Sequence, residues 1–215
     1  MTMTEPQKNA ALPVRPYFEV GADGWCRPDE VVRHSSPNCD ARPAGCSADL
    51  LVIHNISLPP GQFGGPYIAD LFSNRLDYDA HPYFDQLRPL RVSSHFLILR
   101  DGGVVQFVSA NDRAWHAGVS SFEGRERCND FSIGIELEGS DFEQFSDLQY
   151  QALATLTHAL RLRYPLAAVT GHEHIAPGRK TDPGPFFDWT QYQQALAGHM
   201  PQALSTPPLR FPVID

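Results

Sequence analysis

The sequence predicts an α/β fold, with a single domain built on a central mixed β-sheet flanked by helices. Strand-like segments come early in the chain and helix-like segments are interleaved with them. Residues 50–56 are apolar along their length, which is typical of a strand buried on both faces, whereas residues 131–138 alternate with a period of two. With 215 residues, 42% of them hydrophobic, the chain is long enough for one domain with a sizeable core.

The first elements surround a loop rich in glycine and proline. The strand at 50–56 runs into this loop, and a short helix is expected from Pro66 to Phe72, because proline is tolerated in a first helical turn. Residues 94–100 and 104–108 flank an Asp-Gly-Gly sequence. Asp-Gly between two apolar runs predicts a β-hairpin.

The alternating segment 131–138 carries apolar side chains on one face and two carboxylates on the other. The polar face either meets water, as in many antiparallel strands, or supplies a catalytic carboxylate. Gly134 on that face would leave room for a substrate backbone beside Glu136. The apolar face consists of Ile133, Ile135 and Leu137, and the polar face consists of Gly134, Glu136 and Glu138.

A capped helix is predicted from about Asp147 to Tyr164. Ser146 and Gln149 have the spacing of a capping box at its start, and Pro165 ends it. The apolar stripe expected to pack on the core consists of Leu148, Leu153, Leu156 and Leu160.

A short strand at 167–170, a loop and a last helix complete the predicted order of elements. The loop, residues 171–187, is rich in glycine and proline, and Asp188 is placed to cap the helix that follows it.

Three regions are expected along the chain: a mobile N-terminal extension at 1–16, the domain at 17–199 and a Pro-rich C-terminal tail at 200–215. The start of the chain lacks the basic and apolar regions of a secretory signal. No stretch approaches the ~18 consecutive apolar residues of a membrane-spanning helix. A cytoplasmic location is therefore expected.

The four cysteines form no C-x-x-C pair, so free thiols are expected. A structural zinc site on the first three is the alternative, although their wide spacing argues against it. The cysteines are Cys26, Cys39, Cys46 and Cys128.

The charge balance excludes a general nucleic-acid binder. The formal net charge is −8, and nucleic-acid binding domains are typically basic. The chain has only two lysines, Lys8 and Lys180, which draws attention to the surroundings of Lys180.

Residues that can bind a metal are concentrated at two places. His54 lies near the end of the first strand, before the Gly/Pro-rich loop, and is either a buried core histidine or the edge of a site. His172 and His174 follow the short strand at 167–170. If the next segment is extended, Lys180 and Asp182 point to the same side, as site groups or as an exposed ion pair.

These residue types fit the hydrolysis of an amide by a zinc enzyme. Zinc held by two imidazoles and one carboxylate keeps a fourth position open for water and lowers the pKa of that water towards ~7. A glutamate on the alternating strand would take the proton and return it to the leaving nitrogen. A lysine ammonium would stabilise the oxyanion.

Four long motifs resemble a known enzyme family over most of the chain, from about Gly24 to Ala197. They are residues 50–66 around His54, residues 114–120 (Ala-Trp-His-Ala-Gly-Val-Ser), residues 124–139 around Glu136 and residues 170–185 around Lys180. They are similar to the 1,6-anhydro-N-acetylmuramoyl-L-alanine amidases, which are cytoplasmic zinc hydrolases of peptidoglycan recycling.

The resemblance implies the fold of peptidoglycan-recognition proteins and phage-lysozyme amidases, and one Zn²⁺ ion. It implies His54, His172 and Asp182 as metal ligands, in preference to His174. It also implies Glu136 as catalytic base and Lys180 as the group that stabilises the tetrahedral intermediate.

The implied substrate is a small molecule, an anhydromuropeptide cut between the lactyl group and L-alanine. No nucleic acid, membrane or obligate protein partner is expected. Arginine forks suit the peptide carboxylates, although each arginine could equally be an ordinary surface residue. The expected substrate-binding residues are Asn55, Arg91, Trp115, His116 and Arg127.

Two other functions compete with this interpretation. A non-catalytic peptidoglycan-binding module of the same fold typically lacks a metal ligand, whereas all candidate ligands and Glu136 are present here. A secreted or phage lytic amidase would act on the intact wall, and the absence of an export signal disfavours the secreted form.

Overall fold

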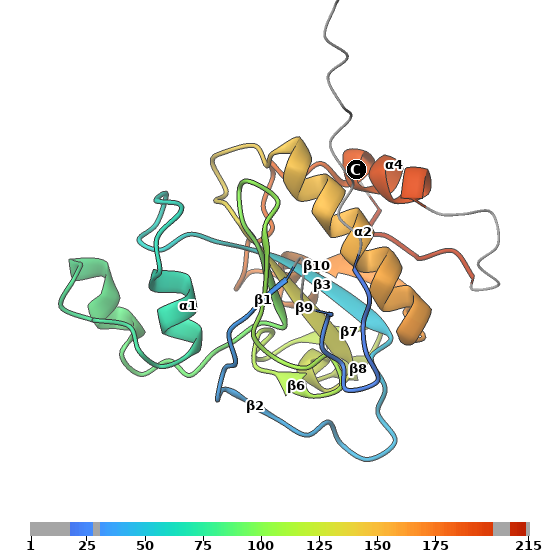
Figure 1. The fold of residues 1–215 in the computed structure, drawn as a ribbon, viewed down its shortest axis with the longest axis horizontal. Coiled ribbons are helices and arrows are strands. Elements are labelled where there is room, and N and C mark those ends of the chain that lie inside the picture. The colour runs from blue at the N-terminus through green and yellow to red at the C-terminus, as the bar shows by residue number, and fades with distance from the viewer. Residues whose placement is uncertain (1–17, 28–30, 200–206, 214–215) are drawn as a thin grey trace, which may run out of the picture.

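A six-stranded mixed sheet forms the centre of the structure, a computed structural model that describes residues 18–27, 31–199 and 207–213 (Figure 1). The strand order is β1-β5-β4-β9-β3-β10. Only β4 and β5 pair antiparallel, as the predicted hairpin, and the other neighbours are parallel. The strands are β1 (Val31–Arg33), β3 (Leu50–Ile56), β4 (Phe96–Ile98), β5 (Val104–Gln106), β9 (Ser132–Glu138) and β10 (Ala168–Gly171).

The predicted α/β class with a central mixed sheet and flanking helices is confirmed. Two small two-stranded sheets and two 3₁₀ turns lie in the connections. The small strands are β2 (Cys39–Asp40), β6 (Arg113–Ala114), β7 (Ser121–Phe122) and β8 (Arg125–Glu126). The 3₁₀ turns are η1 (Pro82–Leu87) and η2 (Cys128–Asp130), and the helices are α1 (Tyr67–Phe72), α2 (Asp147–Arg163), α3 (His172–Ile175) and α4 (Trp189–His199).

Both faces of the central strands are buried, as predicted for β3. Ile133, Ile135 and Leu137 of β9 share one face, and they belong to the core that also includes buried residues of α2 and α4. The opposite face of β9 is not an exposed polar face, because all seven residues of the strand are buried. The alternative of a solvated polar face is therefore wrong, and Glu136 and Glu138 are enclosed carboxylates.

Helix α2 begins with the predicted capping box. The Ser146 hydroxyl accepts from the Gln149 N–H at 3.2 Å, and the Gln149 side chain accepts from the Ser146 N–H at 3.0 Å. Leu153, Leu156 and Leu160 are fully buried, but Leu148 is 46% exposed. The prediction for Leu148 is wrong because this residue packs beside the hairpin turn at Gly102.

The last helix starts as predicted, since the Asp188 carboxylate accepts from the Gln191 N–H at 2.9 Å. Beyond it, residues 207–213 return to the edge of the sheet. The Val169 N–H donates to the Arg210 carbonyl at 2.8 Å, and the Arg210 N–H donates to the Ala167 carbonyl at 3.1 Å. The extension expected at 1–16 and part of the tail expected at 200–215 lie outside the described residues.

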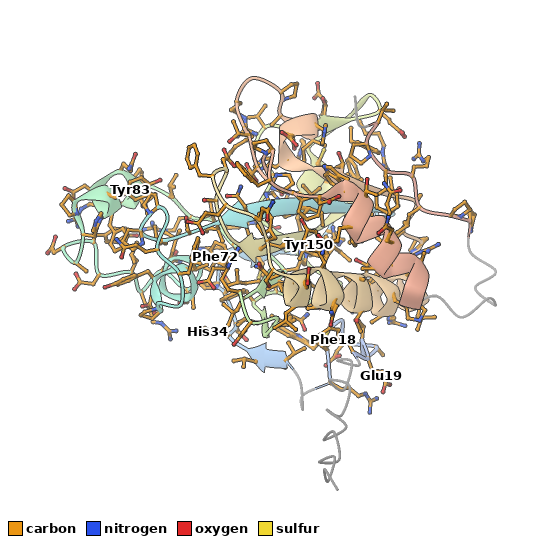
Figure 2. The ribbon with its side chains drawn as sticks, turned by 90° about the horizontal axis from the view of Figure 1, so that it is seen from above. Phe18, Glu19, His34, Phe72, Tyr83 and Tyr150 are labelled. Atoms are coloured by element: carbon orange, nitrogen blue, oxygen red, sulfur yellow. The ribbon has the colours of Figure 1, made fainter. Side chains whose placement is uncertain are left out.

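A segment between β3 and β4 extends from one end of the sheet, away from α2. Figure 2 shows Phe72 and Tyr83 in this segment and Tyr150 on the α2 side of the molecule. The segment has its own apolar core, which joins the sheet through Leu97. It includes the Gly/Pro-rich loop, α1 and η1, and it forms one wall of the pocket described below.

All four cysteines are free thiols, as the sequence predicts. Among the helices that the structure describes, none combines the length and the apolar character that crossing a bilayer requires.

The different burial of Leu156 and Leu148 in α2 gives a prediction for stability. Leu156→Ala should lower the free energy of unfolding by about 2–5 kcal/mol, because it opens a cavity in the core. Leu148→Ala should cost far less, because this side chain is nearly half exposed. Urea unfolding of both variants measures the difference, and equal losses would contradict the assigned faces.

Candidate metal centre and its pocket

Three adjacent parallel strands bring the site residues together. His54 of β3 pairs in register with Glu136 of β9, so their side chains lie side by side on one face of the sheet. His172 follows the end of β10, the other neighbour of β3. The site therefore lies towards the carboxyl ends of these strands, where ligands bind in many α/β proteins.

A single carboxylate oxygen links the two histidines. The Oδ2 atom of Asp182 lies 2.9 Å from Nδ1 of His54 and 3.0 Å from Nδ1 of His172. The ligand atoms of the three residues lie within 4.8 Å of one another. Two imidazole nitrogens and one carboxylate oxygen are a donor set that zinc takes in hydrolases, so these residues fit a metal ion.

The segment that carries Asp182 is anchored on both sides. The Glu173 N–H donates to the Asp182 carbonyl at 2.8 Å. The Asn55 amide donates to the Pro183 carbonyl at 3.0 Å and to Asp141 at 2.7 Å. Asn55, which the sequence analysis places in substrate binding, thus uses its NH₂ group to position the ligand-bearing loop.

Burial keeps His54 neutral. It lowers the pKa of His54 to about 4, although the contact with Asp182 acts in the opposite direction. Burial also acts to raise the pKa of Asp182, but the contacts with His172 and His54 outweigh it and hold that pKa well below its usual value. At neutral pH the site therefore offers a neutral His54 imidazole and an ionised carboxylate, the forms that bind metal ions.

Glu136 is an enclosed carboxyl group beside this centre. Burial, and then the charge of Asp182, raise its pKa well above the usual value, while Lys180 acts to lower it. Its Oε2 atom is buried and has no hydrogen-bond partner among the described residues. A carboxyl in this environment is suited to hold a transferred proton.

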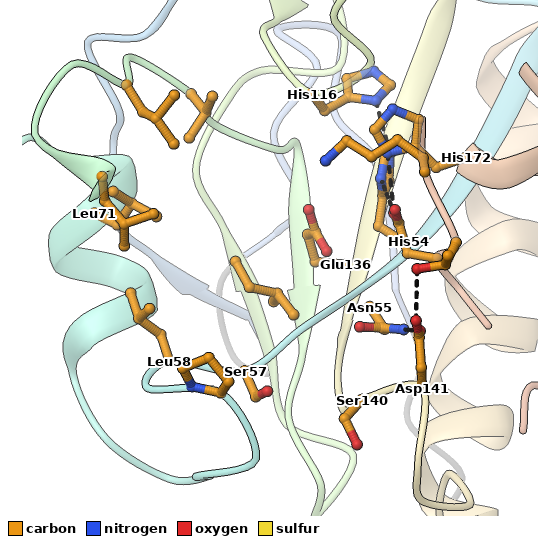
Figure 3. Close-up of a pocket in the computed structure, with 18 of the residues that line it drawn as sticks. His54, Asn55, Ser57, Leu58, Leu71, His116, Glu136, Ser140, Asp141 and His172 are labelled. Atoms are coloured by element: carbon orange, nitrogen blue, oxygen red, sulfur yellow. Dashed lines mark hydrogen bonds and ion pairs between the residues drawn. The ribbon is translucent and has the colours of Figure 1, made fainter. Parts of the chain in front are cut away.

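The site opens into a cavity of about 650 Å³ with two unlike walls. Figure 3 shows Glu136 between the histidines on one side and Leu58 and Leu71 on the other. Lys180 is exposed and also lines the cavity. One wall therefore carries the charged and metal-binding groups, and the facing wall, from the segment between β3 and β4, is largely apolar.

Two histidines near the centre have defined partners. Both ring nitrogens of His116 contact protein atoms, with Nδ1 lying 2.9 Å from Nε2 of His54 and Nε2 lying 3.1 Å from the Ser132 hydroxyl. The His174 ring accepts from the Gly171 N–H at 3.1 Å and so caps α3. The space expected beside Gly134 for a substrate is filled, because the His116 ring occupies it.

The remaining predicted substrate-binding residues lie further out. Arg127 is 70% exposed, pairs with Asp130 and lines a second, neighbouring pocket that shares Arg179 with the main cavity. Arg91 is exposed and donates to the carbonyls of residues 88 and 90. Trp115 is half-buried and is not among the described residues that line the main cavity.

The sequence analysis missed Asp141. This carboxylate lines the cavity and accepts from Asn55 and from the Thr181 hydroxyl, at 2.7 and 2.5 Å. It thereby ties the end of β3 to the loop that carries Lys180 and Asp182. The sequence feature that could have pointed to Asp141 is its position three residues after the carboxyl end of β9, next to the site residues of that strand.

Comparison with known proteins identifies relatives. A family model described as N-acetylmuramoyl-L-alanine amidase matches residues 44–185. The 1,6-anhydro-N-acetylmuramyl-L-alanine amidase AmpD of Citrobacter freundii is 58% identical over 173 residues, covering 80% of this chain and 91% of the relative. A crystal structure of a Se-Met derivative of AmpD has a TM-score of 0.78 and 57% identity, covering 81% of this chain and 97% of the other.

A more distant relative has been solved with a ligand. It is the N-acetylmuramyl-L-alanine amidase AmiD from E. coli in complex with the substrate anhydro-N-acetylmuramic acid-L-Ala-D-γ-Glu-L-Lys. Its TM-score is 0.51 at 32% identity, with 72% of this chain and 60% of that chain covered.

The donor set predicts the effect of removing one ligand. Asp182→Ala should weaken Zn²⁺ binding by more than roughly 10²-fold, because losing a direct ligand exceeds the 10–100-fold cost of losing a supporting contact. Glu173→Gln, a neighbouring carboxylate outside the donor set, should bind zinc almost normally. Competition with a chromophoric chelator measures both affinities, and unchanged binding in the Asp182 variant would refute the assignment.

The buried His95 predicts a loss of stability in acid. Burial, and then Arg42, lower its pKa to about 3. Below pH 6.5 the unfolded chain takes up a proton on His95 that the folded protein does not, so metal-free protein should lose stability as the pH falls. Between pH 6.5 and 5 the contribution of His95 is roughly 2 kcal/mol.

His95→Asn is the matched variant, because its side-chain oxygen can still accept from the Gly134 N–H that now donates to Nδ1 of His95 at 3.0 Å. Urea unfolding at pH 7 and pH 5 should show a smaller pH dependence in this variant. The same pH dependence in both proteins would mean that His95 is not the group that titrates.

Proposed function

Because this chain belongs to the N-acetylmuramoyl-L-alanine amidase family, we propose that it is a zinc-dependent hydrolase of 1,6-anhydromuramoyl peptides. The bond cut is the amide between the lactyl group of the muramic acid and L-alanine. The relatives with 58% identity carry this activity in their name, and the AmiD complex holds an anhydromuropeptide. We propose further that it acts in peptidoglycan recycling and is located in the cytoplasm.

The observation that carries the proposal is the arrangement of four groups around one cavity. The three candidate metal ligands, His54, His172 and Asp182, converge, and Glu136 lies next to them in strand register. A binding module would need neither a metal donor set nor an enclosed carboxyl group beside it. This arrangement favours an enzyme over the non-catalytic alternative.

Zinc at this site would supply Lewis acidity, which polarises an amide carbonyl and makes water acidic near neutral pH. The Glu136 carboxylate accepts the proton of the attacking water and returns it to the amide nitrogen as that bond breaks. Its enclosure suits this task, because a raised pKa lets the carboxyl hold the proton between the two steps.

Lys180 supplies positive charge at the open side of the cavity. We assign to its ammonium group the stabilisation of the oxyanion that forms on the amide oxygen. Lys180 and Glu136 line the same cavity, and the positive charge of Lys180 acts to lower the pKa of Glu136.

We assign recognition of the peptide carboxylates to two arginines outside the main cavity. Arg91 and Arg127 present exposed guanidinium groups, which suit the carboxylates of a muropeptide stem. The other candidate substrate contacts are Asn55, Trp115 and His116. Asn55 also bonds to Asp141, and His116 also contacts His54.

The proposal predicts that zinc-loaded protein releases free peptide from a 1,6-anhydro-N-acetylmuramyl peptide. Glu136→Gln keeps the size of the side chain but cannot take the proton. It should retain one zinc per chain and lose roughly 10²–10⁴-fold in kcat. Chromatography with mass detection gives the turnover, and metal analysis gives the zinc content.

Near-normal turnover in the Glu136 variant would show that another group transfers the proton. Wild-type protein that binds zinc but releases no peptide would leave the binding-module alternative. A strong preference for whole sacculi over the anhydro fragment would instead indicate a lytic amidase that acts on the intact wall.

A further inference from the structure

A chain of polar contacts leads away from the metal centre through the His116 ring. We propose that His116 is a positioning residue that fixes which ring nitrogen of His54 is free to bind the metal. The inference rests on the proposed metal site. It concerns the contacts of His116 and Ser132, which are both buried, although His116 also borders the cavity.

The direction of each hydrogen bond follows from the far end of this chain. The Ser132 hydroxyl lies 2.6 Å from the Cys128 carbonyl oxygen. A carbonyl oxygen can only accept a hydrogen bond, so the Ser132 hydroxyl donates its single hydrogen to it. Its oxygen must then accept from Nε2 of His116, which lies 3.1 Å away.

The remaining steps determine the tautomer of His54. Neither ring nitrogen of His116 contacts a carboxylate in the described part of the chain, and a buried imidazole without such a partner is neutral. With its one hydrogen on Nε2, His116 offers a lone pair at Nδ1. It therefore accepts from Nε2 of His54 at 2.9 Å, and Nδ1 of His54 keeps the lone pair that faces Asp182.

The second ligand is oriented by the next residue of the same segment. Nε2 of His172 donates to the Ala117 carbonyl at 3.0 Å, which leaves its Nδ1 free in the same way. The N–H groups of His116 and Ala117 both donate to the Asn129 side chain, at 3.1 and 2.8 Å. Residues 116 and 117 thus form one fixed support behind both ligands.

Gly134 explains how the ring of His116 reaches this position. A Cβ atom at residue 134 would lie 2.5 Å from Cγ of His116, so a side chain there would displace the ring. Strand β9 has a glycine two residues before Glu136, and the His116 ring occupies the space that a side chain at this position would fill.

Three substitutions at His116 distinguish this role from simple packing. In His116→Asn, the side-chain oxygen can take the place of Nδ1 and still accept from His54. In His116→Gln, the amide reaches towards the Nε2 position, and in His116→Ala no acceptor is left. Zinc affinity should stay within about threefold of the parent in the Asn variant and fall roughly 10–100-fold in the other two.

Two serines provide a matched control. Ser132→Ala removes the acceptor for His116 and should weaken Zn²⁺ binding roughly two- to tenfold, as expected for one hydrogen bond. Ser94→Ala removes a buried hydroxyl that has no partner among the described residues, and it should leave the affinity unchanged. Chelator competition on the full chain gives each Kd, and thermal melting shows whether each variant is folded.

A measurement on the unaltered protein does not depend on any variant folding. In long-range ¹⁵N–¹H spectra of the zinc-loaded protein, His54 should carry its hydrogen on Nε2. A hydrogen on Nδ1 of His54 would overturn the proposal. Equal zinc affinity in all three His116 variants, or any ranking other than Asn above Gln and Ala, would overturn it as well.

Discussion

The site depends on one constraint: two imidazole Nδ1 atoms must point at the same carboxylate oxygen. The parallel pairing of β3 with its two neighbours meets this constraint. It places His54 between Glu136 on one side and the start of α3 on the other. A shift of one residue in either register would turn these side chains to the opposite face, which packs against α2 and α4.

The same enclosure that positions these groups also sets their chemistry. Burial keeps His54 neutral and raises the pKa of Glu136, whereas the two imidazoles hold Asp182 ionised. Enclosed polar groups are costly unless they are bonded. The two imidazoles are bonded to residues 116 and 117, whereas Oε2 of Glu136 has no partner among the described residues. The apolar wall across the cavity belongs to a different part of the chain, the segment between β3 and β4.

Much of this architecture could be predicted from the sequence, because local patterns specify it. The apolar run at 50–56, the alternation at 131–138 and the capping box at Ser146 each correspond to an observed element. The pattern could not reveal which strands pair or how the connections cover them. For that reason the sequence predicts Leu148 in the core, gives no indication of the role of Asp141 and assigns to substrate the space beside Gly134 that His116 fills.

The central claim is that one zinc ion binds at Nδ1 of His54, Nδ1 of His172 and the Asp182 carboxylate. Anomalous diffraction at the zinc absorption edge, from crystals of the zinc-loaded protein, tests it directly. The account predicts one peak at about 2.0–2.2 Å from these three atoms. A peak at the cysteines, or coordination of either histidine through Nε2, would contradict it.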